Sequence, residues 1–165
     1  MLVVDDNKVI RQLIRVNLEL EGFEVVTAAD GVECLDVIHQ VRPDVVTLDV
    51  VMPRLDGLRT AARLRADPRT RNLPLAIVSA CTQYEVESGL DVGVDAFLAK
   101  PFEPAELVRL VRQLMERRGA GVAGSGSASS GSSASGTANA SSTTFESAES
   151  VYGTGETERA GRTGS

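Results

Sequence analysis

The sequence Val45-Val46-Thr47-Leu48-Asp49 is a short, mostly apolar run that ends in a carboxylate. Apolar runs without polar alternation are typical of strands buried on both faces of a parallel sheet. Three further runs also end in polar residues, namely Leu2-Val3-Val4 before Asp5-Asp6, Leu75-Ala76-Ile77-Val78 before Ser79, and Ala96-Phe97-Leu98-Ala99 before Lys100-Pro101. If all four are parallel strands of one sheet, three carboxylates, a hydroxyl and an ammonium group meet at the edge where α/β sheets bind ligands.

The segments between these runs carry helix signals. Apolar residues at helical spacing follow the first run and end at Gly22, and residues 23–27 have the pattern of one more strand. The remaining helices are expected from Asp30 to Pro43, from Asp56-Gly57 to about Ala66, over a weaker signal at 84–92, and from Pro104 onward. Asp30 and Asp56 are interpreted as helix caps or turn residues rather than as parts of a site.

Strand and helix alternate five times in this interpretation, which predicts parallel pairing with right-handed crossovers and helices on both faces. We therefore predict an α/β fold, a doubly wound five-stranded parallel sheet of the flavodoxin-like class with strand order 2-1-3-4-5. This order places the first and third strands side by side, so Asp6 and Asp49 should be neighbours. Clustered carboxylates repel unless a hard cation that prefers oxygen ligands, such as Mg²⁺, joins them.

The composition changes abruptly at Gly119 in this chain of 165 residues. From there on Gly, Ser, Ala and Thr dominate, a composition that cannot bury enough apolar surface to offset the entropy of ordering. We predict a folded domain over 1–118 and a disordered tail over 119–165. The formal net charge is −6 for the chain and −2 for the tail, which leaves −4 on the domain and argues against binding to a nucleic-acid backbone.

The sequence also limits where the protein can act. Cys34 and Cys81 lack partners in a metal or redox motif, so we expect reduced thiols and a cytoplasmic protein. We expect no membrane span and no secretory signal, because no long apolar run is present. Almost nothing precedes the first strand, so we expect a few native residues ahead of Met1, and the tail lacks the pattern of a DNA-binding domain.

Six fragments carry a resemblance to a known family. In chain order they are Val3-Val4-Asp5-Asp6-Asn7, Ala29-Asp30-Gly31, Arg42-Pro43-Asp44, Asp49-Val50-Val51-Met52-Pro53 with Asp56-Gly57, Val78-Ser79-Ala80, and Lys100-Pro101-Phe102. Together the fragments span nearly all of residues 1–118. In this region the sequence resembles the receiver domains of two-component response regulators, the single-domain, CheY-like members especially.

The resemblance implies a phosphoacceptor protein rather than an enzyme, one that catalyses only its own Mg²⁺-dependent phosphorylation and dephosphorylation. Asp49 would accept the phosphoryl group, and Mg²⁺ would be bound by Asp6, Asp49 and the backbone carbonyl of Val51. Asp5 would bind the ion through water or orient the site. The resemblance further implies that Ser79 and Lys100 contact the phosphoryl group, and that a cis peptide bond before Pro101 directs Lys100 into the site. It also implies that Ser79 and Phe97 act as switch residues, although plain core packing explains Phe97 equally well.

The resemblance also implies partners. The phosphoryl donor would be a sensor histidine kinase or a phosphotransfer protein, because His39 is the single histidine and the chain cannot form its own phosphotransfer module. A downstream protein would bind the face made by the fourth helix, fifth strand and fifth helix. We assign no role to His39, and we interpret the arginines around the third helix as a solvated face, with a docking surface as the alternative.

Other functions fit less of the sequence. A haloacid-dehalogenase-like phosphatase also uses a strand-end Asp and Mg²⁺, but it requires Asp-x-Asp where Asp5-Asp6-Asn7 has Asn. Flavin binding requires a phosphate loop rich in Ser, Thr and Gly after the first strand, and residues 7–10 do not provide one. A receiver-like module that works without phosphorylation stays an open alternative.

Overall fold

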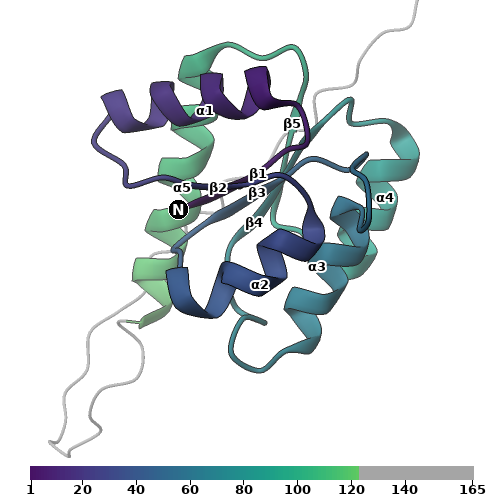
Figure 1. Cartoon of the computed structure of the whole chain (residues 1–165). Helices are drawn as coiled ribbons and strands as arrows, with labels where there is room; N and C mark the ends of the chain where they lie inside the picture. The colour runs from purple at the N-terminus through teal and green to yellow at the C-terminus, as the bar shows by residue number, and fades with distance from the viewer. Residues whose placement is uncertain (123–165) are drawn as a thin grey trace, which may run out of the picture. The chain divides into compact units, whose positions relative to one another are not determined.

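A computed structural model describes residues 1–122, and the predicted tail from residue 123 onward lies outside the described residues (Figure 1). The ten elements are β1 (Leu2–Val4), α1 (Lys8–Leu20), β2 (Val26–Ala28), α2 (Gly31–Val41), β3 (Val46–Leu48), α3 (Gly57–Ala66), β4 (Leu75–Ser79), α4 (Gln83–Val92), β5 (Ala96–Ala99) and α5 (Pro104–Val122). The last helix thus continues past residue 118, the expected end of the domain.

The five strands form one parallel sheet in the order β2-β1-β3-β4-β5, which confirms the predicted topology. The chain changes direction across the sheet at β1, which pairs with β2 on one side and β3 on the other. The register aligns Val4 with Leu48, so the residues that follow β1 and β3 emerge side by side. The sheet therefore brings Asp5, Asp6 and Asp49 to one edge.

Helices cover both faces of the sheet (Figure 1). Alternate strand residues point to opposite faces, so Leu2 and Val4 pack with Ile38 of α2 and Leu64 of α3, whereas Val3 packs on the other face. That other face is closed by apolar residues of α1 and α5, which are Ile14, Leu18, Leu107, Val108 and Val111. Among the helices described, none is both long and apolar enough to span a bilayer.

Side-chain caps explain where the helices begin. Asp30 accepts a hydrogen bond from the backbone N–H of Glu33, and Asp56 accepts one from that of Arg59, so both are N-caps as predicted. The helix with the weakest sequence signal, α4, starts one residue earlier than expected. It begins after Thr82 because Thr82 and Glu85 cap each other's backbone N–H groups.

The predicted boundary of the second strand was wrong. The strand was expected over 23–27, but β2 begins only at Val26. The backbone N–H of Phe23 donates to the carbonyl of Leu18, and Gly22 has a positive φ of 90°, which together form the turn that closes α1. The residues before Val26 are thus used to end the helix.

Candidate functional site

The predicted site residues gather at the carboxyl edge of the sheet. Asp5 and Asp6 follow β1, Asp49 follows β3, Ser79 ends β4, and Lys100 follows β5. Three carboxylate oxygens, one each from Asp5, Asp6 and Asp49, lie within 4.8 Å of one another. The structure therefore brings together a set of oxygen donors of the kind that hard divalent cations prefer.

The three carboxylates differ in their surroundings. Asp5 is 2% exposed and Asp49 is 9% exposed, whereas Asp6 faces solvent. The backbone N–H of Asn7 donates to Asp5 Oδ1 at 2.9 Å, and Lys100 Nζ donates to Asp5 Oδ2 at 2.7 Å. Asp5 is thus held on both oxygens.

Lys100 enters the site from the end of β5, which is an edge strand of the sheet and lies two strands away from β3. Its Nζ lies 3.5 Å from Asp49 Oδ2 and is closer to Asp5. The Lys100–Pro101 peptide bond is cis, as the resemblance implied. One ammonium group therefore lies between the buried carboxylates of Asp5 and Asp49. A single positive charge cannot neutralise these two and the carboxylate of Asp6 as well.

Asp49 has a raised pKa, chiefly because it is buried. Burial raises its pKa to about 6, and although Lys100 opposes this shift, the charges of Asp5 and Asp6 add to it. The backbone N–H of Asp49 donates to the carbonyl of Val4, which fixes its position at the end of the sheet. A buried carboxylate with unbalanced like charges is a common feature of functional sites.

Gly57 lies directly against the backbone of Asp49, a contact that the sequence interpretation missed. A Cβ atom at Gly57 would overlap the backbone carbonyl oxygen of Asp49, so only glycine fits here. The N–H of Gly57 also donates to the carbonyl of Val50 at 2.9 Å. The Asp56-Gly57 pair was visible in the sequence as a helix start, but the close approach depends on how α3 lies against β3.

Hydrogen bonds hold the loop between β3 and α3 against the N-terminus of α2. Arg54 Nε donates to Asp30 Oδ2 at 2.7 Å, and the N–H of Gly31 donates to the carbonyl of Leu55. Val51 lies in this loop with an exposed side chain. Its predicted role as a carbonyl ligand stays a prediction.

Ser79 has a partner that the sequence interpretation did not foresee. Its hydroxyl donates to Glu85 Oε2 at 3.0 Å and accepts from the backbone N–H of Cys81 at 3.1 Å. Glu85 is only 6% exposed. The spacing Thr82-x-x-Glu85 marks a helix start in the sequence, but nothing in it indicates that this carboxylate reaches back to the end of β4.

Phe97 is half-buried in β5, and its ring lies against Gly89 of α4. A Cβ atom at Gly89 would stand 2.7 Å from one ring carbon, so the glycine leaves room for the aromatic ring. The predicted switch residues Ser79 and Phe97 thus contact one helix, α4.

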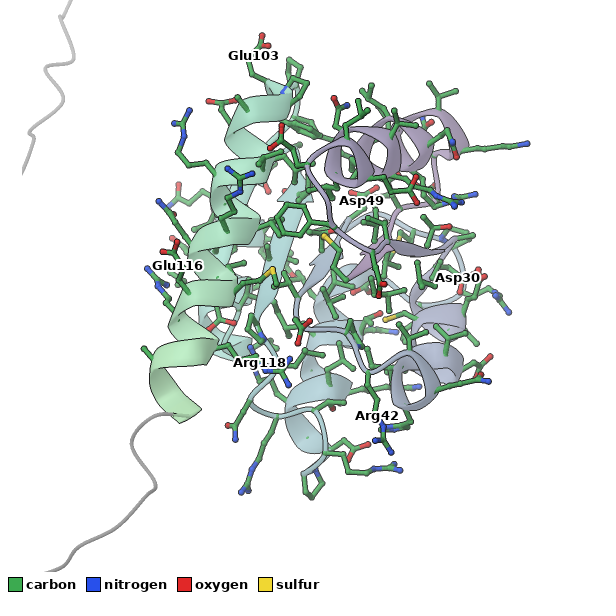
Figure 2. All side chains as sticks on the ribbon, turned by 90° about the vertical axis from the view of Figure 1, so that its left-hand side faces the viewer. Asp30, Arg42, Asp49, Glu103, Glu116 and Arg118 are labelled. Carbon is green, nitrogen blue, oxygen red and sulfur yellow. The ribbon has the colours of Figure 1, made fainter. Side chains whose placement is uncertain are left out.

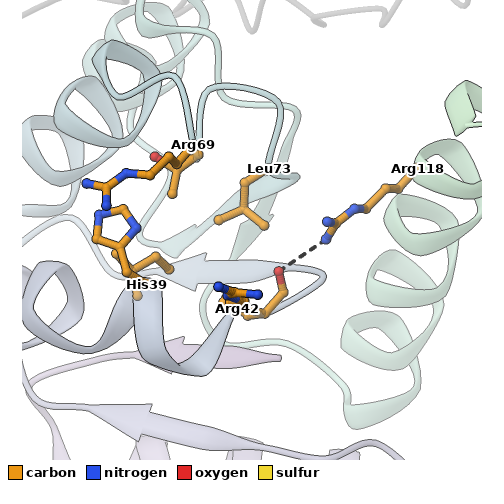
Figure 3. Close-up of a pocket in the computed structure, with 8 residues that line it drawn as sticks. His39, Arg42, Arg69, Leu73 and Arg118 are labelled. Carbon is orange, nitrogen blue, oxygen red and sulfur yellow. Dashed lines mark hydrogen bonds between the residues drawn. The ribbon is translucent and has the colours of Figure 1, made fainter.

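The opposite edge of the sheet has a pocket of about 420 Å³ (Figure 3). Figure 2 shows Asp49 toward one end of the molecule and Arg42 and Arg118 toward the other. His39 lies in this pocket with its Nε2 3.0 Å from Asp67 Oδ2, and Arg69 pairs with the same carboxylate. These contacts give His39 a structural partner far from the acidic cluster.

Comparisons with known proteins agree with this geometry. The family model of the response regulator receiver domain matches residues 1–112. The response regulator MprA of Mycobacterium sp. (strain KMS) is 44% identical over 118 residues, and the DNA-binding dual master transcriptional regulator RpaA of Synechocystis sp. is 36% identical over 118 residues. Each alignment covers 71% of this chain, and the chain spans about half the length of these curated relatives, 50% for MprA and 49% for RpaA.

Solved structures give the same result. The chemotaxis protein CheY4 of Vibrio cholerae matches with a TM-score of 0.66 and 32% identity, over 68% of this chain and 95% of that one. The receiver domain of the Francisella response regulator 1452 matches with a TM-score of 0.65 and 38% identity, over 71% of this chain and 96% of that one.

Proposed function

Because the chain belongs to the family of response regulator receiver domains, we propose that Asp49 is its phosphoacceptor and that phosphorylation switches the binding of a partner protein. The observation that carries this proposal is the state of Asp49. It is buried at a strand end, its pKa is raised to about 6 by burial, and Lys100 Nζ stands 3.5 Å away. A carboxylate in this position can act as a nucleophile, and the ammonium group of Lys100 beside it can stabilise the negative charge of a phosphoryl group.

The chemical step needs little beyond positioning. A carboxylate oxygen of Asp49 attacks the phosphorus of a phosphohistidine, an O–P bond forms, and the P–N bond breaks as the imidazole leaves with the electron pair. Lys100 and the hydroxyl of Ser79 balance the charge on the phosphoryl oxygens. Hydrolysis of the resulting acyl phosphate by water returns the protein to its starting state, so the chain acts on itself rather than on an external substrate.

Mg²⁺ is the cation that we propose for the acidic cluster. Asp6, Asp49 and the carbonyl of Val51 would bind it, and Asp5, held by Asn7 and Lys100, would orient the site. When bound, the ion supplies positive charge that offsets the carboxylates and the transferring phosphoryl group. The donor set fits, because the converging side-chain ligands are all carboxylate oxygens.

The partners follow from the family. A sensor histidine kinase or a phosphotransfer protein would donate the phosphoryl group in the cytoplasm. A protein effector would bind α4, β5 and α5, and this is supported by Tyr84 and Leu90, two large side chains that α4 exposes to solvent. DNA binding, which the name of RpaA records for that protein, is not proposed for the acidic receiver domain.

The phosphatase alternative receives no support from Asn7. Its side chain accepts hydrogen bonds from the backbone N–H groups of Val9 and Ile10 and so caps α1. An amide has no carboxyl proton to donate, so Asn7 cannot act as the second acid of an Asp-x-Asp motif, and its side chain serves as a helix cap instead.

The proposal is tested by incubating the protein with acetyl phosphate and Mg²⁺ and mapping the added phosphoryl group by mass spectrometry. We expect the label on Asp49, a requirement for Mg²⁺, and its loss in Asp49→Ala. Asp67→Asn is the control, since it changes an aspartate that pairs with His39 and Arg69 far from the acidic cluster and should label normally. Equal labelling of wild type and Asp49→Ala would refute the assignment.

A further inference from the structure

The hydroxyl of Ser79 can donate one hydrogen bond, and in this structure Glu85 accepts it. The distance from Ser79 Oγ to Glu85 Oε2 is 3.0 Å, and the carboxylate can only accept. The other contact of the hydroxyl, from the N–H of Cys81, uses Ser79 Oγ as an acceptor. A phosphoryl oxygen on Asp49 that bonds to Ser79, as the proposed function requires, would compete with Glu85 for this donor.

Glu85 is at the same time a structural part of α4. Its Oε2 accepts the backbone N–H of Thr82 at 2.9 Å, and its own N–H donates to Thr82 Oγ1 at 3.3 Å. One carboxylate oxygen therefore joins the end of β4 to the first turn of α4.

The remaining attachment of α4 is weak. Its only buried residues are Glu85 and Gly89, whereas α1 buries Ile14 and Leu18. Gly89 lies one turn after Glu85 and receives the ring of Phe97. Apart from Val92, which packs partly buried against the core, the helix is thus held by a hydrogen-bonded carboxylate and a glycine contact rather than by fully buried apolar side chains, which is typical of elements that move at low energetic cost.

We propose that Glu85 regulates the phosphorylation switch by holding the Ser79 hydroxyl in the unphosphorylated protein. This inference rests on the proposed function of Asp49. When the phosphoryl group takes the hydroxyl, Glu85 is left as a buried carboxylate with one donor fewer, a costly state. The carboxylate leaves its pocket, the N–H of Thr82 loses its acceptor, and the first turn of α4 loosens. Glu85 is a positioning residue here, since it acts on the site through Ser79.

The test measures the affinity of the Mg²⁺-loaded protein for beryllofluoride, which bonds to a carboxylate and imitates a phosphoryl group. Glu85→Gln keeps a residue that suits the third position of a capped helix, but it replaces a charge-assisted hydrogen bond by a neutral one. We expect this variant to bind beryllofluoride about three- to tenfold more tightly than wild type. An unchanged or weaker affinity would overturn the inference.

Two further variants separate the proposed cause from other effects. In a Ser79→Ala background, Glu85→Gln should change affinity by less than about twofold, because the competing hydroxyl is absent. An equal gain in both backgrounds would mean that the lost charge acts directly, and the inference would fail. Thr82→Ala removes the side-chain cap of α4 but keeps the bond from Ser79 to Glu85, so its gain in affinity should be clearly smaller than that of Glu85→Gln, and an equal or larger gain would also overturn the inference.

A measurement on the unaltered protein needs no variant. We expect the amide of Thr82 to exchange its hydrogen faster when beryllofluoride is bound, because its acceptor has moved away. Unchanged protection alongside clear beryllofluoride binding would contradict the role of Glu85 and leave the assignment of Asp49 intact. Absence of any beryllofluoride binding by wild type would overturn both.

Discussion

Asp30 and Asp49 are both buried aspartates at the carboxyl ends of strands, yet their surroundings shift their pKa values in opposite directions. The backbone N–H of Glu33 lowers the pKa of Asp30, burial opposes this, and Arg54 lowers it again by a hydrogen bond and its charge. Burial raises the pKa of Asp49 to about 6, and its neighbours Asp5 and Asp6 add to the shift. The same residue type at the same kind of position is a helix cap with a lowered pKa in one place and a carboxylate with a raised pKa in the other.

The difference lies in whether hydrogen bonds and nearby charges outweigh burial, which they do at Asp30 and do not at Asp49. Asp30 has its own cation and a helix N-terminus, both of which favour the ionised form. Asp49 shares a single ammonium group with Asp5, so part of the negative charge of this cluster stays unbalanced in the absence of a bound cation. Asp30 is thus paired within the fold, whereas we propose that a bound cation balances the charge of Asp49.

The largest expected effect comes from Gly57→Ala, which removes the support of Asp49. The added methyl group would overlap the carbonyl oxygen of Asp49, so α3 or the end of β3 must move. We expect the free energy of unfolding to fall by roughly 3 kcal/mol or more. Chemical denaturation measures this, and Gly119→Ala, where nothing lies within 4 Å of the new atom, is the control that should remain near wild type. A loss below about 1 kcal/mol in Gly57→Ala would show that the close approach is not required.

Arg54→Ala breaks the balance at Asp30. The arginine side chain is 59% exposed, so screening limits the loss of stability to about 1–2 kcal/mol, and the pKa of Asp30 should rise. The control is Arg59→Ala, which removes a cation from another N-cap aspartate. Arg59 is more exposed and stands 3.6 Å from Asp56, so its loss should cost less than about 0.5 kcal/mol. Equal losses in the two variants would contradict a special role for the pair of Asp30 and Arg54.

Asp49→Asn should do the opposite and stabilise the protein in buffer without divalent metal. Removing one of three close carboxylates relieves repulsion and burial of charge, by on the order of 1 kcal/mol at pH 7. Asp6→Asn is the control, and it should gain less because Asp6 is exposed. Mg²⁺ should then raise the thermal midpoint of wild type more than that of Asp49→Asn. If the thermal midpoint of Asp49→Asn in metal-free buffer lies below that of wild type, repulsion among the carboxylates does not destabilise the fold.

The pH dependence of this gain gives the smallest effect. Because the folded state binds the Asp49 proton more tightly than the unfolded state, stability contributed by this group falls as pH rises from about 3.8 to about 6. The difference in unfolding free energy between Asp49→Asn and wild type should therefore be small near pH 4 and constant above pH 6. A difference that does not change across this window would mean that Asp49 has an ordinary pKa.

Much of this architecture was accessible from the sequence. Unbroken apolar runs, each ending in a polar residue, predicted four of the strands. The alternation of strands and helices predicted a doubly wound sheet, and the strand order of that class brought Asp6 and Asp49 together. The features that were missed depend on contacts between distant segments. Neither the close approach of Gly57 to Asp49 nor the hydrogen bond between Ser79 and Glu85 leaves a periodic signal in the sequence, because both depend on how a helix docks on the sheet.

Lys100 shows the same limit. Its place after the fifth strand predicted that it would enter the site, but not that it would lie closer to Asp5 than to Asp49. Side-chain distances of this kind depend on the twist of the sheet and on packing across 95 residues of sequence separation.

The most direct test of the central claim is a carbon-13 NMR titration of the aspartate carboxyl groups, first without divalent metal and then with Mg²⁺. We predict that Asp49 titrates near pH 6 without metal and at clearly lower pH with Mg²⁺, because the cation favours the ionised carboxylate. Asp30 should titrate below its ordinary value in both conditions. An Asp49 that titrates near pH 4 and does not respond to Mg²⁺ would contradict the account.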